Sequence, residues 1–215
     1  MQLAPDPFNL VVRGQWNQAI FSPDWVRTHL RQGQDQVTLA LPVNNPAAPF
    51  RVSFDSFSLH CGAERLEIHT TQALTPASVT ACQQLAIQIL QLLPHTPVTA
   101  VGMNVRVLDT DNPDRVYAHF AYGDAGRMPA DRYVLQWTDL RRKYRVSDHT
   151  SLNLSIGYDP QTVRMEFNYH SDVARSQEAV ERLTNPPCAE RLAEVHRFLE
   201  TVYGSPIAVP EQAAA

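Results

Sequence analysis

The sequence predicts an α+β fold: a tandem duplication of a β-α-β(3-4)-α unit that forms one curved antiparallel sheet, with long helices packed on one face. The first observation is that three short motifs occur twice and in the same order. Residues 22–30 resemble residues 112–120, residues 65–68 resemble residues 164–167, and residues 89–98 resemble residues 198–207. The second observation is that apolar and polar residues alternate in several short runs of each half, which is typical of strands with one buried face.

Composition places the chain among ordinary globular proteins. It has 215 residues, of which 44% are hydrophobic and 19% are charged, so it is long enough to bury a substantial core. The formal net charge of −4 argues against a protein that is basic throughout, although it leaves room for a local basic patch. The three cysteines form no Cys-x-x-Cys pair, and no basic segment followed by an apolar stretch opens the chain. We therefore expect a cytoplasmic protein without a membrane span.

The first half begins with β-forming residues from 8 to 20, which predict a bent strand or a hairpin. Ser22 is expected to cap a short helix whose first residues are Pro23 and Asp24. Four strands follow, around residues 37–41, 50–54, 57–60 and 65–69, and a long helix then runs from Thr75 to about Leu93.

The second half repeats this order. A strand is expected at residues 98–108, a short helix after Asn112, and a loop at residues 122–129. Further strands are expected around 133–140, 151–158 and 163–169, with an inserted helical turn at 176–183 and a long helix after Pro187, to about Tyr203. We divide the chain into a first half (1–96), a second half (97–206) and a flexible tail (207–215), and we expect the two halves to form one compact domain.

This order of elements is similar to that of TATA-binding-protein-like folds and, less closely, to that of helix-grip folds. The resemblance covers the order of elements along most of the chain and involves no shared motif. The two units by themselves predict a sheet with its second face open to water. The resemblance does not extend to DNA binding, because a fold does not imply a function.

Two Asp/His pairs occur in the duplicated short helices, Asp24 with His29 and Asp114 with His119. Each Asp precedes its His by five residues, about 140° around a helix, so the two side chains do not share a face. The Asp suits a helix start, where the helix dipole favours negative charge, and we interpret the His as a packing residue.

Ionisable residues also gather on the predicted open face of the sheet. The first half has His60, Glu67 and His69, and the second has Glu166 and His170. His and Glu side chains bind zinc and similar metals, but the sequence lacks a His-x-Glu-x-His spacing. Ion pairs of Arg65 with Glu67 and of Arg164 with Glu166 explain the acidic residues more simply. The sequence therefore predicts no metal site and no cofactor.

One run of charge stands out in this acidic chain. It lies between two predicted strands, at a hairpin end, and is our candidate partner-binding segment. Its members are Arg141, Arg142, Lys143, Tyr144 and Arg145. Four cations around one aromatic residue suit contact with phosphate or with an acidic protein.

The chain has no Gly-rich phosphate loop, no Gly-x-Ser-x-Gly and no His-Glu-x-x-His. Trp16, Trp25 and Trp137 are more typical of a core than of a stacking platform. We therefore expect a non-enzymatic protein-interaction or assembly module, either a homo-oligomer or a subunit of a larger bacterial or phage-type complex. The alternatives are a nucleic-acid-binding protein that uses the sheet face or residues 141–145, and an enzyme with dispersed catalytic residues, including His29 or His119, in a groove between the halves.

Overall fold

The computed structural model describes residues 1–30, 36–42, 49–121, 132, 134–204 and 206–207, and within them the fold is α+β. One antiparallel sheet contains every described strand, in the spatial order β2-β3-β4-β5-β1-β6-β9-β8-β7. The strands are β1 (Gln2–Gly14), β2 (Val37–Ala40), β3 (Phe50–Phe54), β4 (Phe57–Cys61), β5 (Arg65–Thr70), β6 (Val98–Asp109), β7 (Thr138–Arg145), β8 (Thr150–Asp159) and β9 (Thr162–Asp172).

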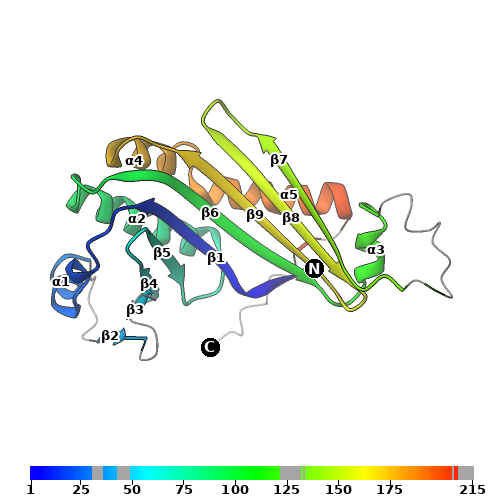
Figure 1. The fold of residues 1–215 in the computed structure, drawn as a ribbon, viewed down its shortest axis with the longest axis horizontal. Helices are drawn as coiled ribbons and strands as arrows, with labels where there is room; N and C mark the ends of the chain where they lie inside the picture. Colours follow the sequence, from blue (N-terminus) through cyan, green and yellow to red (C-terminus); the bar gives the residue numbers. More distant parts are fainter. Residues whose placement is uncertain (31–35, 43–48, 122–131, 133, 205, 208–215) are drawn as a thin grey trace.

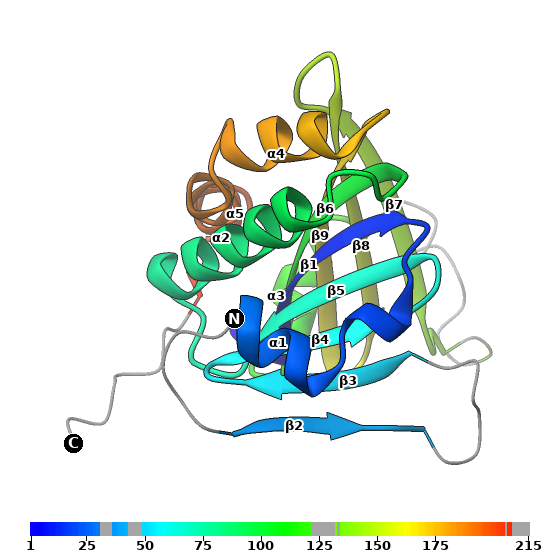
Figure 2. The same cartoon turned by 90° about the vertical axis from the view of Figure 1, so that its left-hand side faces the viewer.

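Three helices cover one face of this sheet. They are α2 (Pro76–Leu92), α4 (Ser176–Thr184) and α5 (Cys188–Tyr203), and they gather on one side in Figure 2. The short helices α1 (Pro23–His29) and α3 (Pro113–Tyr117) lie near opposite ends of the molecule in Figure 1. A single 3-10 turn, η1 (Gln18–Ile20), precedes α1. Strand direction turns strongly from β2 and β3 to β8 and β7, as the right-handed twist of strands requires.

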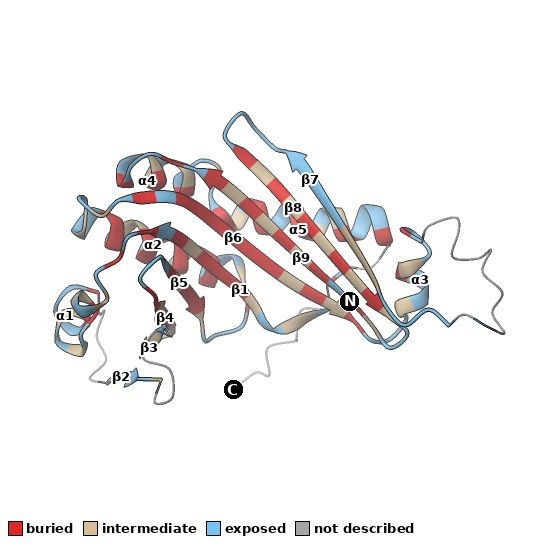
Figure 3. Ribbon diagram, viewed as in Figure 1, coloured by how far each residue is buried: buried red, intermediate tan, exposed pale blue. Residues whose placement is uncertain are grey.

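The core lies between the sheet and these helices because alternate residues of the strands are apolar. Along β8 the buried residues are every second one from Thr150 to Tyr158. Figure 3 shows the same alternation, of buried with less buried residues, along the central strands. Fully buried side chains include Phe8 and Leu10 of β1, Met103 of β6 and Phe167 of β9. Burial of this apolar surface is the main source of stability for such a fold.

Helices α1, α2 and α3 start where capping residues stand in the sequence. Ser22 accepts a hydrogen bond from the Trp25 backbone N–H at the start of α1, and Asn112 accepts one from Arg115 at the start of α3. Thr75 and Ser78 form a reciprocal capping box at the start of α2. These observations confirm the starts that the sequence predicts for these three helices.

The prediction for the basic run was wrong in its local structure. The sequence predicts a strand at 133–140 followed by a hairpin end, whereas β7 begins at Thr138 and contains the whole run to Arg145. An edge strand tolerates consecutive charges because it is solvated along one side, so it lacks the clear apolar alternation of an inner strand. The N-terminal strand also differs: β1 begins at Gln2 and ends at Gly14, and the residues after it form η1.

The expected loop at 122–129 and residues 208–215 of the expected tail lie outside the described residues. None of the described helices combines the length and the apolar character that crossing a lipid bilayer demands.

Candidate functional site

A row of asparagines crosses the centre of the sheet face that the helices leave open. Asn9, Asn104, Asn168 and Asn153 stand on β1, β6, β9 and β8, each directly opposite the next. The Asn104 amide donates to Asn9, 2.8 Å away, Asn168 donates to Asn104, and Asn153 donates to Asn168, 2.9 Å away. Only 3% of Asn9 is exposed. This centre is therefore buried and hydrogen-bonded, whereas the sequence predicts a solvated face.

The asparagine row leads to a cluster of ionisable groups in the first half. Asn9 donates a hydrogen bond of 3.1 Å to Oε2 of Glu67 on β5. His69 lies two residues further along β5, and its Nε2 is 3.3 Å from the same oxygen. Its Nδ1 is 3.0 Å from Oδ1 of Asp6, on β1. His60 of β4 is directly opposite Glu67, and its ring stacks on that of His69 with 4.1 Å between centroids.

Glu67 is held from several sides. Besides His69 and Asn9, the Arg65 Nε donates to its other oxygen, Oε1, at 2.8 Å. These contacts, with the His69 hydrogen bond the largest, lower the pKa of Glu67 to about 2 against the opposing effect of its burial. The predicted ion pair of Arg65 with Glu67 is confirmed.

The two histidines of the cluster differ in basicity. Burial, assisted by the nearby charge of His69, lowers the pKa of His60 to about 4. Burial would also lower the pKa of His69, but its hydrogen bonds to the carboxylates of Glu67 and Asp6 outweigh burial and raise it above its usual value. In the protonated His69 ring both nitrogens are donors, one to each carboxylate.

The second half has a different set of residues at the same strand positions. Glu166 of β9 faces Ser155 of β8, as Glu67 of β5 faces His60 of β4. Glu166 pairs with Arg106 of β6 at 3.4 Å, and not with Arg164. The predicted pairing of Arg164 with Glu166 is therefore wrong: Arg164 lies 3.5 Å from Asp159, at the β8–β9 turn.

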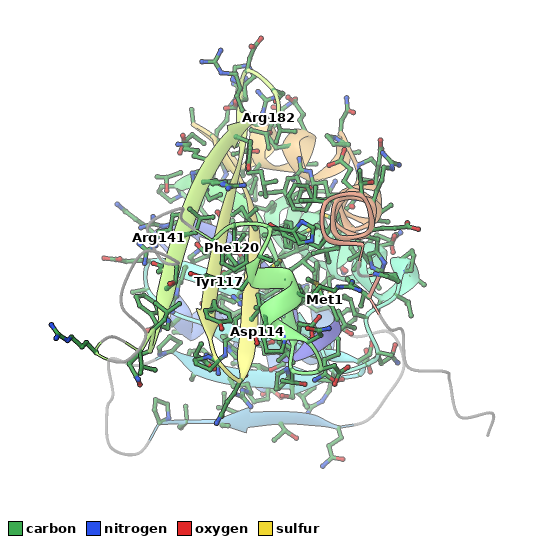
Figure 4. The ribbon with its side chains drawn as sticks, turned by 90° about the vertical axis from the view of Figure 1, so that its right-hand side faces the viewer. Met1, Asp114, Tyr117, Phe120, Arg141 and Arg182 are labelled. Carbon is green, nitrogen blue, oxygen red and sulfur yellow. The ribbon has the colours of Figure 1, made fainter. Side chains whose placement is uncertain are left out.

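The basic run forms the outer edge of the sheet. β7 pairs with β8 on one side, and no described strand pairs with its other side. Arg141, Lys143 and Arg145 face Ser155, Asn153 and Ser151 of β8, so they stand on the open face. Arg142 and Tyr144 face the buried Leu154 and Leu152, so they stand on the helix side. Figure 4 shows Arg141 on this border strand.

Exposed apolar side chains concentrate along the same edge. Among the described residues, nine large apolar side chains are exposed, and five of them lie between positions 134 and 146: Val134, Leu135, Trp137, Tyr144 and Val146. Trp137, whose exposed fraction is 61%, lies just before β7. Figure 3 shows that most of β7 is exposed, in contrast to the strands beside it. Exposed apolar residues therefore flank the cations at both ends of β7, and apolar residues beside charged ones suit contact with a protein partner.

A hollow of about 520 Å³ extends this edge at the β7–β8 turn. Its lining includes Lys143, Arg145, His149 and His170. Of the four cations of the run, only Arg141 makes an ion pair with a described residue, at 3.0 Å from Asp139. The edge therefore combines three cations that form no ion pair with a described residue and a recess whose lining also includes Asp148 and Asp172.

Backbone groups of β7 alternate between β8 and the free edge. The Val146 N–H donates to the Thr150 carbonyl at 2.9 Å, just beyond the end of the strand. In an antiparallel ladder every second residue bonds to the neighbouring strand, so residues 140, 142 and 144 bond to β8. The N–H groups of Arg141, Lys143 and Arg145 consequently point away from β8.

The remaining histidine and tryptophan candidates lie elsewhere. His29 packs on Trp25, with 5.1 Å between ring centroids, and His119 packs edge-on against Tyr203 at 5.6 Å. Asp114 accepts a hydrogen bond from the Tyr158 hydroxyl at 2.7 Å. Figure 4 shows Asp114 on α3, a helix that packs against β8 and β9. None of these contacts joins a His to the Asp five residues before it, and Trp16 is buried in the core.

The chain matches no protein-family model, and a search of curated proteins finds no similar sequence.

Proposed function

We propose that the protein is a non-enzymatic interaction module that binds an extended, acidic segment of a partner protein along β7. The observation that carries this proposal is an exposed edge strand whose outward N–H groups and cationic side chains belong to the same residues, Arg141, Lys143 and Arg145. An extended peptide adds to such an edge through main-chain hydrogen bonds, and its side chains select the partner.

Charge complementarity supports an acidic partner. Side chains of an added strand alternate between the two faces of the sheet. Acidic residues at every second position would meet Arg141, Lys143 and Arg145 on the open face. Apolar residues between them would meet Tyr144 and Leu140 on the helix side.

The same charges disfavour self-association through β7. Pairing β7 with β7 of a second copy would bring cations of both strands to one face, and like charges opposite each other destabilise a sheet. A homo-oligomer, if it forms, would use another surface, and light scattering after size-exclusion chromatography measures this directly.

Binding of nucleic acid is less well supported. Two of the arginines on the open face are already paired with carboxylates, Arg65 with Glu67 and Arg106 with Glu166. Arg13 and Arg51 also stand on this face, but the carboxylates of Glu67 and Glu166 lie among the described arginines and interrupt a basic surface for a phosphate backbone.

We also propose that the two halves derive from duplication of one unit. The strand order supports this: outward from the centre, β1, β5, β4 and β3 of the first half match β6, β9, β8 and β7 of the second. On this view β7 and β3 are counterparts, and β7 became an edge because the second half has no counterpart of β2 among the described residues.

Replacing Lys143 by proline tests strand addition. Proline removes one outward N–H and leaves the hydrogen bonds to β8 intact, so we expect binding of a fluorescein-labelled peptide of alternating Glu and Val to weaken by about tenfold. Fluorescence anisotropy at low salt measures the affinity.

The matched control is Lys143→Ala, which removes the same charge but keeps the N–H. An exposed ion pair contributes roughly 0.2–1 kcal/mol, so this variant is expected to lose no more than about fivefold in affinity. Equal losses in the two variants, or no binding by the unaltered protein, would contradict the proposal.

A further inference from the structure

We propose that His60, Glu67 and His69 bind one divalent transition-metal ion of the zinc class on the open face of the sheet. This inference does not depend on the proposed function, because the cluster lies on β4 and β5, in the half of the sheet opposite β7. Among the described residues, these three form the group of His, Cys, Asp and Glu side chains whose ligand atoms converge, all within 4.8 Å of one another.

The donor set and the spacing suit zinc. Two histidines and one carboxylate are a frequent set of three protein ligands for zinc, with bonds of about 2.0–2.1 Å. Two ligands on a tetrahedral ion are then roughly 3.3 Å apart. The distance between His69 Nε2 and Glu67 Oε2 is 3.3 Å, so these two already have this spacing. His60 is only partly buried, and a nitrogen of its ring lies within 4.8 Å of the ligand atoms of Glu67 and His69.

The surroundings of the ligands resemble the outer shell of a metal site. A histidine that binds metal through one nitrogen usually donates the other N–H to a carboxylate, which fixes the ring orientation. Asp6 accepts from His69 Nδ1 in this way, at 3.0 Å, and leaves Nε2 directed at Glu67. Arg65 and Asn9 hold the Glu67 carboxylate in position at 2.8 and 3.1 Å. The ligands are thus oriented without the ion.

Room for a further ligand lies beside Glu67. This carboxylate, unlike the rings of His60 and His69, lines a hollow of about 490 Å³ on the open face, together with Asn9, Arg65 and Asn104. Three protein ligands with an open coordination position are the arrangement of zinc sites that bind a water molecule or an exchangeable group. We expect water to complete the coordination in the isolated protein.

The second half provides an internal comparison. At the positions that correspond to His60 and Glu67, β8 and β9 have Ser155 and Glu166, and Asn168 takes the place of His69. The carboxylate is common to both halves, while the two imidazoles occur only in the first. This difference makes Glu166 a matched control for Glu67.

Isothermal titration of the chelator-treated full chain with ZnCl₂, near neutral pH, tests the site. We expect one zinc ion per chain, and at least about tenfold weaker binding for His60→Ala and for Glu67→Gln. His170→Ala, on the same face three strands from Glu67, and Glu166→Gln are expected to leave the affinity within about twofold. Visible absorption of the Co²⁺-loaded protein is expected to show a tetrahedral spectrum that His60→Ala loses.

Thermal melting in the presence of a chelator establishes that each variant is folded. Glu67→Gln keeps the size and shape of the side chain, so it remains informative even where His60→Ala does not fold. Absence of saturable one-to-one zinc binding, or equal affinity of the four variants, would overturn the proposal.

Discussion

Reversing two charges on β7, in the double variant Lys143→Glu with Arg145→Glu, is expected to weaken binding of the alternating Glu/Val peptide by about 30- to 100-fold. Neither side chain makes an ion pair with a described residue, so the folded state should lose little stability. Reversal replaces attraction by repulsion between these two positions and the Glu side chains of the peptide. At roughly 1 to 1.4 kcal/mol for each position, the total of about 2 to 2.8 kcal/mol corresponds to this range.

Arg13→Glu combined with Arg197→Glu is the matched control, because it changes the net charge equally at exposed positions away from β7. Anisotropy titrations at two salt concentrations distinguish contacts of the peptide with β7 from long-range attraction by the net charge of the protein. An equal loss in both double variants would mean that net charge alone attracts the peptide, and it would refute docking at β7.

Phe167→Ala is expected to lower the free energy of unfolding by about 3–5 kcal/mol. Phe167 is fully buried on β9, and its ring packs edge-on against Phe198 of α5 with 5.5 Å between centroids. Truncation leaves a cavity between the sheet and α5, which the surrounding backbone fills only in part.

Urea unfolding with linear extrapolation measures this loss. Phe50→Ala, at a partly buried position of β3 near the edge of the sheet, is expected to cost clearly less. Similar losses at the two positions would contradict the placement of the core between the sheet and the long helices.

Local rules in the sequence predicted most of the helices and inner strands. The Ser-Pro-Asp and Asn-Pro-Asp helix starts and the alternating run of β8 are local signals, and the structure has elements at these positions. The order of the strands in the sheet depends on contacts between distant segments, such as β1 with β6, and periodicity says nothing about which strands pair.

The site was only partly predictable for the same reason. His60, Glu67 and His69 were recognised as a possible group because period two places them on one face. Asp6 was missed, because its contact with His69 depends on the pairing of β1 with β5. The asparagine row was missed too, since Asn9, Asn104 and Asn168 are far apart in sequence and only the register brings them together. The only signal in the sequence was that these asparagines occupy polar positions in strands whose residues alternate between apolar and polar.

The charge pattern of the basic run, residues 141–145, did not determine its secondary structure. A stretch of cations is typical of a turn and equally of an edge strand, and only pairing on one side distinguishes the two. Its assignment as a partner-binding segment remains a prediction.

Amide hydrogen exchange at single residues of β7, measured by NMR with and without the alternating Glu/Val peptide, tests the docking of an extended segment most directly. In the free protein we expect slow exchange at Leu140, Arg142 and Tyr144, and fast exchange at Arg141, Lys143 and Arg145. We expect the peptide to slow exchange at the second set alone and to leave β2, at the opposite edge, unchanged. Binding that leaves Arg141, Lys143 and Arg145 unprotected, or that protects β2 instead, would contradict it.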